Sequence, residues 1–294
     1  MSPAFKQCLR RTSSAIYYEV SHQLVKLGRR PAGRDYTRFI LLGRPRSGSN
    51  LLLLALRQQP SVQTFGELLQ EPRVRWDRKM GFERRHWIEH AYDEPQEYLS
   101  DVVFRDNPTK IKAVGFKLFY HHARKDPQKK VWQFLNEDRD LHVIHLRRRN
   151  LLKIVLSRKL ADRSGEWRLL GSQAGAPTGI SNQPHPVHLD YDELQHKFAK
   201  MKAVEERRGA YYSKHPVLNL WYEDLADDFA AHSRMIQEFL ELDPLPLKPM
   251  TRRQTKRPLD EQIENYAELK KSFAGSEWAG FFEAKGSQTR DARR

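Results

Sequence analysis

The sequence predicts an α/β fold in which a parallel β-sheet is flanked by helices on both faces. Three observations lead to this prediction. Short apolar runs alternate with segments of helical periodicity along most of the chain. The runs are apolar at successive positions, as expected of strands buried on both faces of a parallel sheet. The 294 residues suit one large domain with a substantial core, and they contain no internal repeat.

The strands are expected at four apolar runs, which are 40–42, 112–120, 141–146 and 217–221. A shorter strand is expected to end just before Glu67. Because strands that alternate with helices form right-handed crossover units, these segments should lie side by side in one sheet.

The helices are expected between and after these strands. The segment from Asn50 is apolar, and 150–161 carries leucines and a valine on one side. A loop rich in Gly, Pro, Ser and Asn is expected over 163–188, and a loop of that length in a compact domain is usually functional or mobile. The remaining helices are expected at 95–105, 131–137, 191–208, 229–240 and 259–271.

Three parts of the chain differ in composition. Residues 1–35 form a basic, partly amphipathic segment, in which, up to Arg34, seven Lys and Arg stand against Glu19 as the one acid. This segment packs on the domain, frays or contacts a membrane surface. Residues 36–285 form the expected domain, and 286–294 form a polar, basic tail.

The charge and the cysteine content limit the partners and the compartment. A net charge of +15 indicates anionic partners. Cys8 is a lone cysteine, which excludes an internal disulfide and is typical of a reducing compartment. We find no secretory signal, no apolar run of membrane-spanning length and no Cys/His cluster at zinc spacing. We therefore expect a cytoplasmic protein without a metal, possible peripheral contact with the inner face of a membrane, and no particular oligomeric state.

The most informative segment is the polar turn 43–50, GRPRSGSN, between the first strand and the first helix. Its glycines, Gly43 and Gly48, allow the backbone to curl. The helix that opens at Asn50 points unpaired N–H groups into the curl, and such groups bind anions. The turn therefore predicts a phosphate or sulfate site.

The turn departs from a nucleotide phosphate loop at two positions. That loop needs a lysine and then a metal-holding hydroxyl after its second glycine. Here Ser49 and Asn50 occupy those positions, and Arg46 inside the turn supplies the positive charge. These residues favour an anion site without metal-assisted phosphoryl transfer. In fold terms they predict a sheet like that of the P-loop-containing nucleotide hydrolases.

A second motif, HLRRRNLLKIVLSRKLA over 145–161, follows a strand and opens a helix. Arginines at a helix start oppose the helix dipole unless an anion lies between them. Arg149 and Ser157 are eight positions apart and so share roughly one face. Arg147 and Arg148 are alternatives for the same role, although the spacing favours Arg149.

The two motifs together resemble those of the sulfotransferase superfamily, in its carbohydrate-modifying and bacterial branch. The resemblance extends over most of 39–283 and includes Tyr-Glu-Asp-Leu at 222–225, a basic loop before residue 259 and the closing run 263–283. It implies the donor 3′-phosphoadenosine 5′-phosphosulfate and transfer of its sulfuryl group to an acceptor. The donor-binding residues implied are Arg46, Ser47, Gly48, Ser49, Asn50, Arg149, Ser157, Lys256 and Arg257.

The resemblance also implies the catalytic groups. Arg46 would stabilise the bridging oxygen as the sulfuryl group leaves, and Glu67 in Phe-Gly-Glu-Leu would be the general base. If Glu67 is instead a helix-start residue, Glu71 or the His121–His122 pair is the alternative base. The acceptor expected is a hydroxyl of a carbohydrate or glycolipid. An acceptor wall is expected from Arg75, Trp76, Arg84, Arg85 and Trp87.

Two other functions remain open. A nucleotide kinase or NTPase with a degenerate loop is disfavoured by Ser49 and Asn50. A non-enzymatic protein that binds nucleic acid or a membrane would also explain the charge, but no recognised nucleic-acid motif accompanies the basic clusters. No specific nucleic-acid partner is therefore expected.

Overall fold

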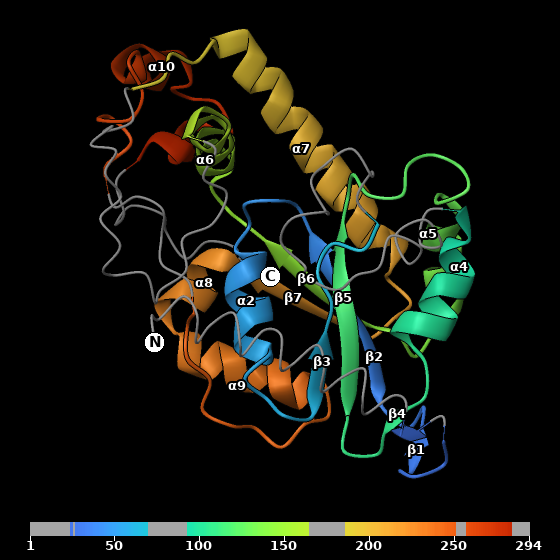
Figure 1. The fold of residues 1–294 in the computed structure, drawn as a ribbon. Coiled ribbons are helices and arrows are strands. Elements are labelled where there is room, and N and C mark those ends of the chain that lie inside the picture. The colour runs from blue at the N-terminus through green and yellow to red at the C-terminus, as the bar shows by residue number, and fades with distance from the viewer. Residues whose placement is uncertain (1–23, 26, 70–92, 165–185, 251–256, 284–294) are drawn as a thin grey trace.

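The protein is seen in a computed structural model, and the residues that the structure describes are 24–25, 27–69, 93–164, 186–250 and 257–283 (Figure 1). The expected acceptor-wall residues, Cys8, Glu71 and Lys256 lie outside these ranges. Within the described ranges, no helix combines the length and the apolar character needed to cross a bilayer.

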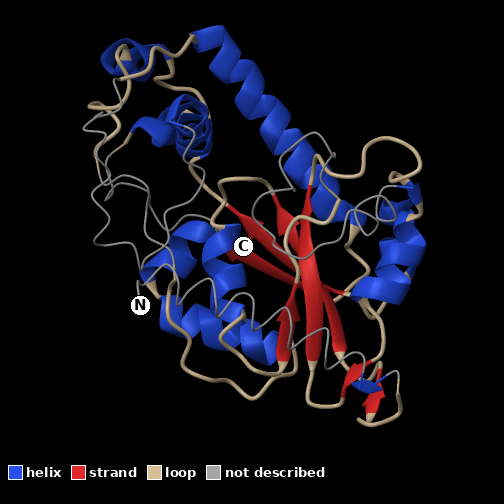
Figure 2. Cartoon of the chain, viewed as in Figure 1, coloured by secondary structure: helices blue, strands red, loops and turns tan. Residues whose placement is uncertain are grey.

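The centre of the molecule is a five-stranded sheet in the order β3-β5-β2-β6-β7, and every neighbouring pair is parallel (Figure 2). The prediction of an α/β fold with a parallel sheet is therefore confirmed. The first strand of this sheet, β2, lies in the middle, and the chain adds strands on both sides of it. The strand bounds are β2 Thr37–Gly43, β3 Val62–Thr64, β5 Ala113–Phe119, β6 His142–Arg147 and β7 Val217–Trp221.

The helices cover both faces of the sheet (Figure 1). Side chains alternate between the faces along each strand, so Ile40 and Leu42 belong to one apolar cluster while Phe39 and Leu41 belong to the other. One face packs against α4 Pro95–Tyr98, the π-helix Leu99–Val103 and α5 Lys130–Glu137; the other packs against α2 Ser49–Leu56, α8 Tyr222–Asp227 and α9 Phe229–Phe239.

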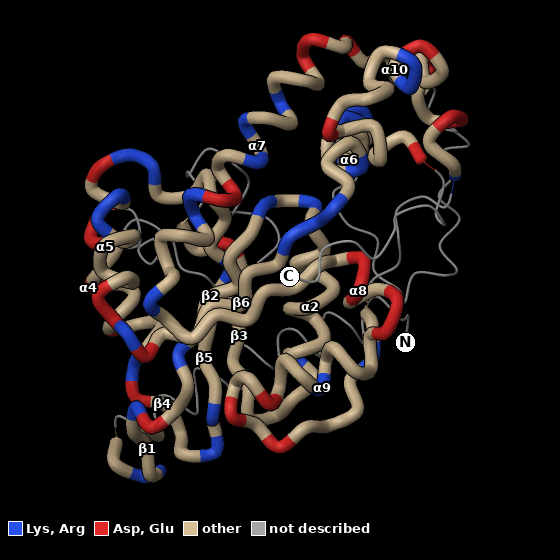
Figure 3. Tube along the Cα trace, turned by 180° about the vertical axis from the view of Figure 1, so that it is seen from behind, with Lys and Arg blue, Asp and Glu red and all other residues tan. Residues whose placement is uncertain are grey.

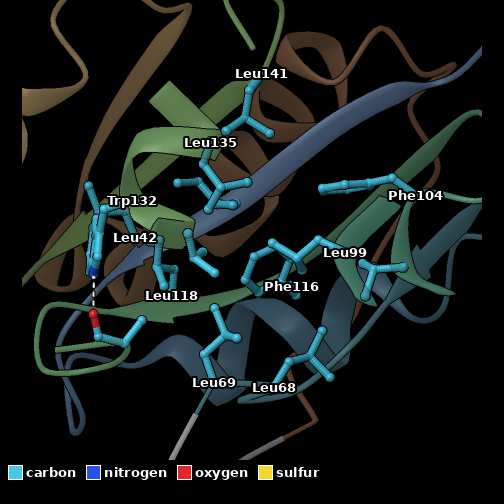
Figure 4. Packing of buried hydrophobic residues seen from close by; sticks show 14 of the residues in the cluster. Leu42, Leu68, Leu69, Leu99, Phe104, Phe116, Leu118, Trp132, Leu135 and Leu141 are labelled. Carbon is cyan, nitrogen blue, oxygen red and sulfur yellow. Dashed lines mark hydrogen bonds between the residues drawn. The ribbon is translucent and has the colours of Figure 1, made fainter. Parts of the chain in front are cut away.

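Figure 4 shows the first of these clusters from close by. Leu42 and Leu118 from the sheet face Trp132 and Leu135 from α5. The indole N–H of Trp132 donates to the carbonyl oxygen of Ala123 at 3.2 Å, which satisfies a polar group that would otherwise be buried without a partner.

A third apolar cluster lies beyond the sheet. It is built from α6 Leu151–Ser164, the N-terminal half of α7 Tyr191–Tyr211, α10 Tyr266–Ser272 and the 3₁₀ turn Ala279–Phe282. Figure 1 shows α6 and α10 standing apart from the strands, with α7 running from them toward α5. We call this part the helical lobe.

Several boundaries differ from the expectation. The segment expected as a helix over 259–271 is helical from Tyr266, because 257–265 forms turns in which Gln262 donates to the carbonyl oxygens of Arg257 and Pro258. The tetrapeptide at 222–225 follows the expected strand 217–221 directly and forms the start of α8. A small antiparallel ribbon, β1 Ala32–Gly33 with β4 Asn107–Pro108, joins the end of the N-terminal segment to the domain.

Candidate active site

The polar turn 43–50 lies at the carboxyl end of β2, the middle strand of the sheet. Ligands of parallel sheets bind at this edge, where the chain switches from one side of the starting strand to the other. Arg46 has φ 70° and Gly48 has φ 91°, so both residues adopt the left-handed conformation that curls the turn. A Cβ atom at Gly48 would overlap the ring of Tyr222, so this position needs glycine for space as well as for conformation.

Arg46 extends from the turn to the helical lobe. Its Nε and Nη2 atoms donate to the Oγ atom of Ser157 on α6, at 2.9 and 2.7 Å. Arg148 approaches from the other side, and its Nη1 atom donates to the carbonyl oxygen of Arg46 at 3.0 Å. Burial lowers the pKa of Arg46, and the charge of Arg148 lowers it further. Two guanidinium groups so close together favour an anion between them.

The other loop residues complete this anion site. The hydroxyl of buried Ser47 donates to the carbonyl oxygen of Arg44 at 2.8 Å and fixes the turn. Ser49 is buried in the first turn of α2, whose unpaired N–H groups lie at the same end.

Arg149 is held differently from Arg148. Its Nη1 and Nη2 atoms donate to the two carboxylate oxygens of Asp224 at 2.6 and 2.8 Å, and its backbone N–H donates to Glu223. The hydrogen bonds that Arg149 donates to Asp224 raise the pKa of Arg149. Figure 3 shows the basic run between β6 and α6 beside the acidic start of α8. Helical spacing does not apply to Arg149, because α6 begins only at Leu151.

Of the basic loop implied to close over the donor, the described part begins at Arg257. Its guanidinium donates to the side chain of Glu261 at 3.2 Å and to the backbone carbonyl of the same residue at 3.0 Å. These bonds tie Arg257 to the turns before α10.

Lys117 is a site residue that the sequence analysis missed. It lies on β5 among apolar neighbours, its exposed fraction is 3%, and its ammonium donates to the Oδ1 atom of Asn50 at the start of α2. A lysine is almost never fully buried without a functional or electrostatic partner. The signal was therefore present as a single charged residue inside a strand that is otherwise apolar.

Glu67 follows β3, at the carboxyl edge of the sheet beside Lys117. The chain after β3 continues to run beside β5, because the backbone N–H of Lys117 donates to the carbonyl oxygen of Gly66 at 3.1 Å. The side chain of Glu67 is 31% exposed, and its Oε2 atom lies 3.9 Å from the Nε2 atom of His122. Burial, reinforced by His121 and Lys117, lowers the pKa of His122 well below its usual value. The ring is therefore neutral, and this contact is not an ion pair.

A second polar network fixes α7 against the same edge of the sheet. The hydroxyl of Tyr120 lies 2.6 Å from the Nε2 atom of His145, and Arg44 lies 3.7 Å from the carboxylate of Glu205 on α7. Burial and the nearby charge of Arg147 lower the pKa of His145 to about 4. Arg44 lies in the polar turn, so its contact with Glu205 ties the turn to α7. No local sequence pattern marks these residues as a group.

No group of three or more His, Cys, Asp or Glu side chains in the described ranges is arranged to hold a metal ion. The arrangement therefore combines an anion site, formed by the turn, Arg46, Ser157 and Arg148, with a neighbouring carboxylate and a buried ammonium. Such a site can hold a phosphorylated ligand and remove a proton from a second molecule beside it.

Comparisons with known proteins agree with this chemistry. A family model described as "Sulfotransferase family" matches residues 39–246. Nodulation protein H of Rhizobium meliloti (strain 1021) is 27% identical over 250 residues, which are 83% of this chain and 94% of that protein. Nodulation protein H of Rhizobium tropici is 26% identical over 253 residues, 83% of this chain and 92% of that protein. A crystal structure of a sulfotransferase from Alicyclobacillus acidocaldarius is 15% identical, with a TM-score of 0.43, and covers 81% of this chain and 91% of that one.

Proposed function

Because the chain belongs to the sulfotransferase family, we propose that it moves a sulfuryl group from 3′-phosphoadenosine 5′-phosphosulfate to a hydroxyl of a carbohydrate or glycolipid, with Glu67 as general base. The observation that carries the proposal is the approach of Arg46, Ser157 and Arg148 around one point at the carboxyl edge of the sheet. The donor is a polyanion, and these residues offer it two guanidinium groups and a hydroxyl in a partly buried site.

The polar turn and Arg46 hold the 5′-phosphate. The backbone N–H groups at the start of α2 point at this position, and Arg46 stabilises the negative charge that develops there. Ser157 and Arg149 hold the 3′-phosphate, and Lys256 and Arg257 supply further positive charge to it. Arg148 is the alternative for Arg149, because it lies nearer to Arg46.

Lys117 and Glu67 act on the transfer itself. The donor supplies an activated sulfuryl group, whose S–O bond to the 5′-phosphate breaks as a new S–O bond forms to the acceptor oxygen. Glu67 takes the proton that the acceptor hydroxyl loses, and the buried ammonium of Lys117 neutralises charge on the leaving phosphate. Positioning and electrostatics then supply most of the rate enhancement.

The competing phosphoryl-transfer function is disfavoured by Asn50. This residue stands where a nucleotide phosphate loop has its metal-holding hydroxyl, and its oxygen accepts from Lys117. An ammonium at that position repels Mg²⁺. The proposed donor should therefore bind without a divalent metal, whereas a kinase or NTPase would need Mg²⁺ for ATP.

The test is a calorimetric titration with adenosine 3′,5′-bisphosphate in chelator, followed by a labelled-sulfate transfer assay. The assay offers glycans, glycolipids and phenols as acceptors. Binding in chelator that ATP does not displace, with transfer to a sugar hydroxyl, supports the proposal. Binding only with Mg²⁺, or binding to DNA that falls steeply with salt, contradicts it. If a phenol is the only acceptor, the proposed sulfuryl transfer stands, but the proposed carbohydrate acceptor is wrong.

The location proposed is cytoplasmic, with contact between the basic N-terminal segment and anionic lipid as a further possibility from charge alone. Sedimentation with vesicles that contain phosphatidylserine, compared with neutral vesicles, measures this contact. Equal recovery in the supernatant with both kinds of vesicle contradicts it.

A further inference from the structure

His122 is a buried histidine fixed at both its backbone and its ring. It lies just after β5 in a tight turn, in which its backbone N–H donates to the carbonyl oxygen of Phe119 at 2.9 Å. The indole of Trp132 donates to the backbone carbonyl of His122 at 3.2 Å. The side chain has no exposed surface. The ring therefore has little freedom to turn.

The hydrogen bonds determine where the ring proton lies. The backbone N–H of Phe119 donates to the Nδ1 atom of His122 at 3.2 Å, so Nδ1 carries a lone pair and no proton. A neutral imidazole has one N–H, which must then be on Nε2. Among the residues that the structure describes, this buried Nε2 atom has no hydrogen-bond partner, and it faces Oε2 of Glu67 at 3.9 Å.

We propose that His122 is a positioning residue for Glu67, whose carboxylate accepts a hydrogen bond from the Nε2–H group and is thereby held, ionised, toward the acceptor hydroxyl. This inference rests on the proposed role of Glu67 as the base. The distance of 3.9 Å is longer than a hydrogen bond, but Glu67 is partly exposed on a segment without secondary structure. Catalytic hydrogen bonds commonly shorten when substrates bind.

The charged and titratable groups around His122 favour this role. The ring of His121 packs edge-on at 4.7 Å between ring centroids, Lys117 approaches from β5, and Glu67 approaches from beyond β3. Burial, together with His121 and Lys117, lowers the pKa of His122 well below its usual value, so the ring stays neutral at the pH at which carboxylates ionise.

The same hydrogen bonds argue against His122 as the base itself. The Nδ1 lone pair is used by Phe119, and Nε2 already carries the proton. To accept a proton from the acceptor, the ring would have to give up the bond from Phe119 and hold two protons in a buried site. A donor role needs neither change.

Two uncharged substitutions distinguish the roles of the two ring nitrogens, Nδ1 and Nε2. His122→Gln places an amide N–H near the Nε2 position, where it can still donate to Glu67. His122→Asn keeps an acceptor for Phe119 near the Nδ1 position but does not reach Glu67. Both remove the imidazole and add an amide, so losses of packing should be similar, and thermal unfolding of both is measured on the assayed samples.

We expect His122→Asn to lower kcat roughly tenfold and to move the acidic limb of the rate–pH profile up by about one pH unit, because an ionised carboxylate loses a donor. The KM for the donor should stay unchanged. His122→Gln should keep most of the wild-type rate and profile. In a Glu67→Gln background, the two His122 substitutions should no longer differ. A general structural role for His122 would lower the residual rate in that background too.

An NMR titration provides a readout that needs no activity. The side-chain carboxyl ¹³C signal of Glu67, identified by its loss in Glu67→Gln, should titrate at higher pH in His122→Asn than in the wild type or His122→Gln. The ¹⁵N signals of the wild-type ring should show a protonated Nε2 atom. A protonated Nδ1 atom, or equal midpoints in all three proteins, overturns the inference.

The two proposals fail in different ways. If the wild type transfers no sulfuryl group but the carboxyl midpoint moves as expected, the function is wrong and the contact between His122 and Glu67 stands. If Glu67→Gln abolishes transfer while both His122 variants behave alike, the function stands and the role of His122 is wrong.

Discussion

Arg46 and Ser157 are 111 positions apart in the sequence, yet the guanidinium of Arg46 donates twice to the hydroxyl of Ser157, from Nε at 2.9 Å and from Nη2 at 2.7 Å. Arg46 lies in the turn after the middle strand, and Ser157 lies in the second turn of α6. A phosphorylated ligand between them contacts both the sheet and the helical lobe. Which arginine of the basic run assists them is the first point to test.

We expect Arg149→Ala to weaken binding of adenosine 3′,5′-bisphosphate about ten- to a hundredfold, the usual cost of a lost charge-assisted contact. Adenosine 5′-phosphosulfate, which lacks the 3′-phosphate, should bind almost as before. Calorimetry on both ligands measures the difference. Arg148→Ala is the matched comparison. If Arg148→Ala discriminates between the ligands and Arg149→Ala weakens both equally, the 3′-phosphate belongs to Arg148.

Gly48→Ala should destabilise the protein more than Gly275→Ala. Both glycines have positive φ angles, but an added Cβ at Gly275 meets no atom within 4 Å, whereas one at Gly48 overlaps the ring of Tyr222. Gly275→Ala should lower the free energy of unfolding by about 1 kcal/mol through backbone strain. Gly48→Ala should lose a further 1–3 kcal/mol or so. Urea unfolding of the two variants tests this, and equal losses would mean that the Tyr222 ring moves aside freely.

Glu67→Gln should lower turnover by roughly a hundred- to ten-thousandfold, because the amide keeps the shape of the side chain and cannot accept the proton. Binding of adenosine 3′,5′-bisphosphate and thermal stability should stay nearly unchanged, and both are measured on the sample that is assayed. Turnover near that of the wild type would exclude Glu67 as the base. The role would then pass to Glu71 or, within the His121–His122 pair, to the exposed His121.

The free energy of unfolding should fall as the pH drops from 6.5 to 4, in part because of His145. Its pKa is lowered to about 4 in the folded protein, so the unfolded chain binds more protons in this interval. Each pH unit between the two pKa values costs about 1.4 kcal/mol, which gives up to about 3 kcal/mol from His145. His145→Gln cannot titrate and keeps an acceptor for Tyr120. Urea unfolding at several pH values should show the stability of the variant gaining on that of the wild type as the pH falls. Parallel curves would contradict the buried, neutral state of His145.

Local pattern was sufficient for much of the fold. The apolar run 217–221 matches β7 at both ends, and the polar turn 43–50 connects β2 to α2 as expected. Asp228 caps α9 by accepting from the backbone N–H of Ala231, and aspartate is a common residue at this position. These features depend on neighbours in sequence, which is why composition and periodicity are enough to find them.

The features that could not be predicted from the sequence depend on contacts between distant segments. Lys117 reads as an exception inside an apolar strand until β5 is placed beside the start of α2. The approach of His122 to Glu67 exists only because β3 pairs with β5, and no local signal encodes that pairing. The choice among three consecutive arginines depends on backbone direction before a helix begins, where helical spacing gives no information.

The helical lobe has an apolar cluster of its own, distinct from the two that cover the sheet. Ser157 belongs to the lobe, and Arg46 belongs to the sheet. A nucleotide that binds both would connect the lobe to the sheet and should suppress local opening of either part. Amide hydrogen exchange should therefore slow in α6 and α10 when adenosine 3′,5′-bisphosphate binds, even though α10 lies beyond the anion site. If so, donor binding makes the enzyme more rigid before the transfer reaction begins.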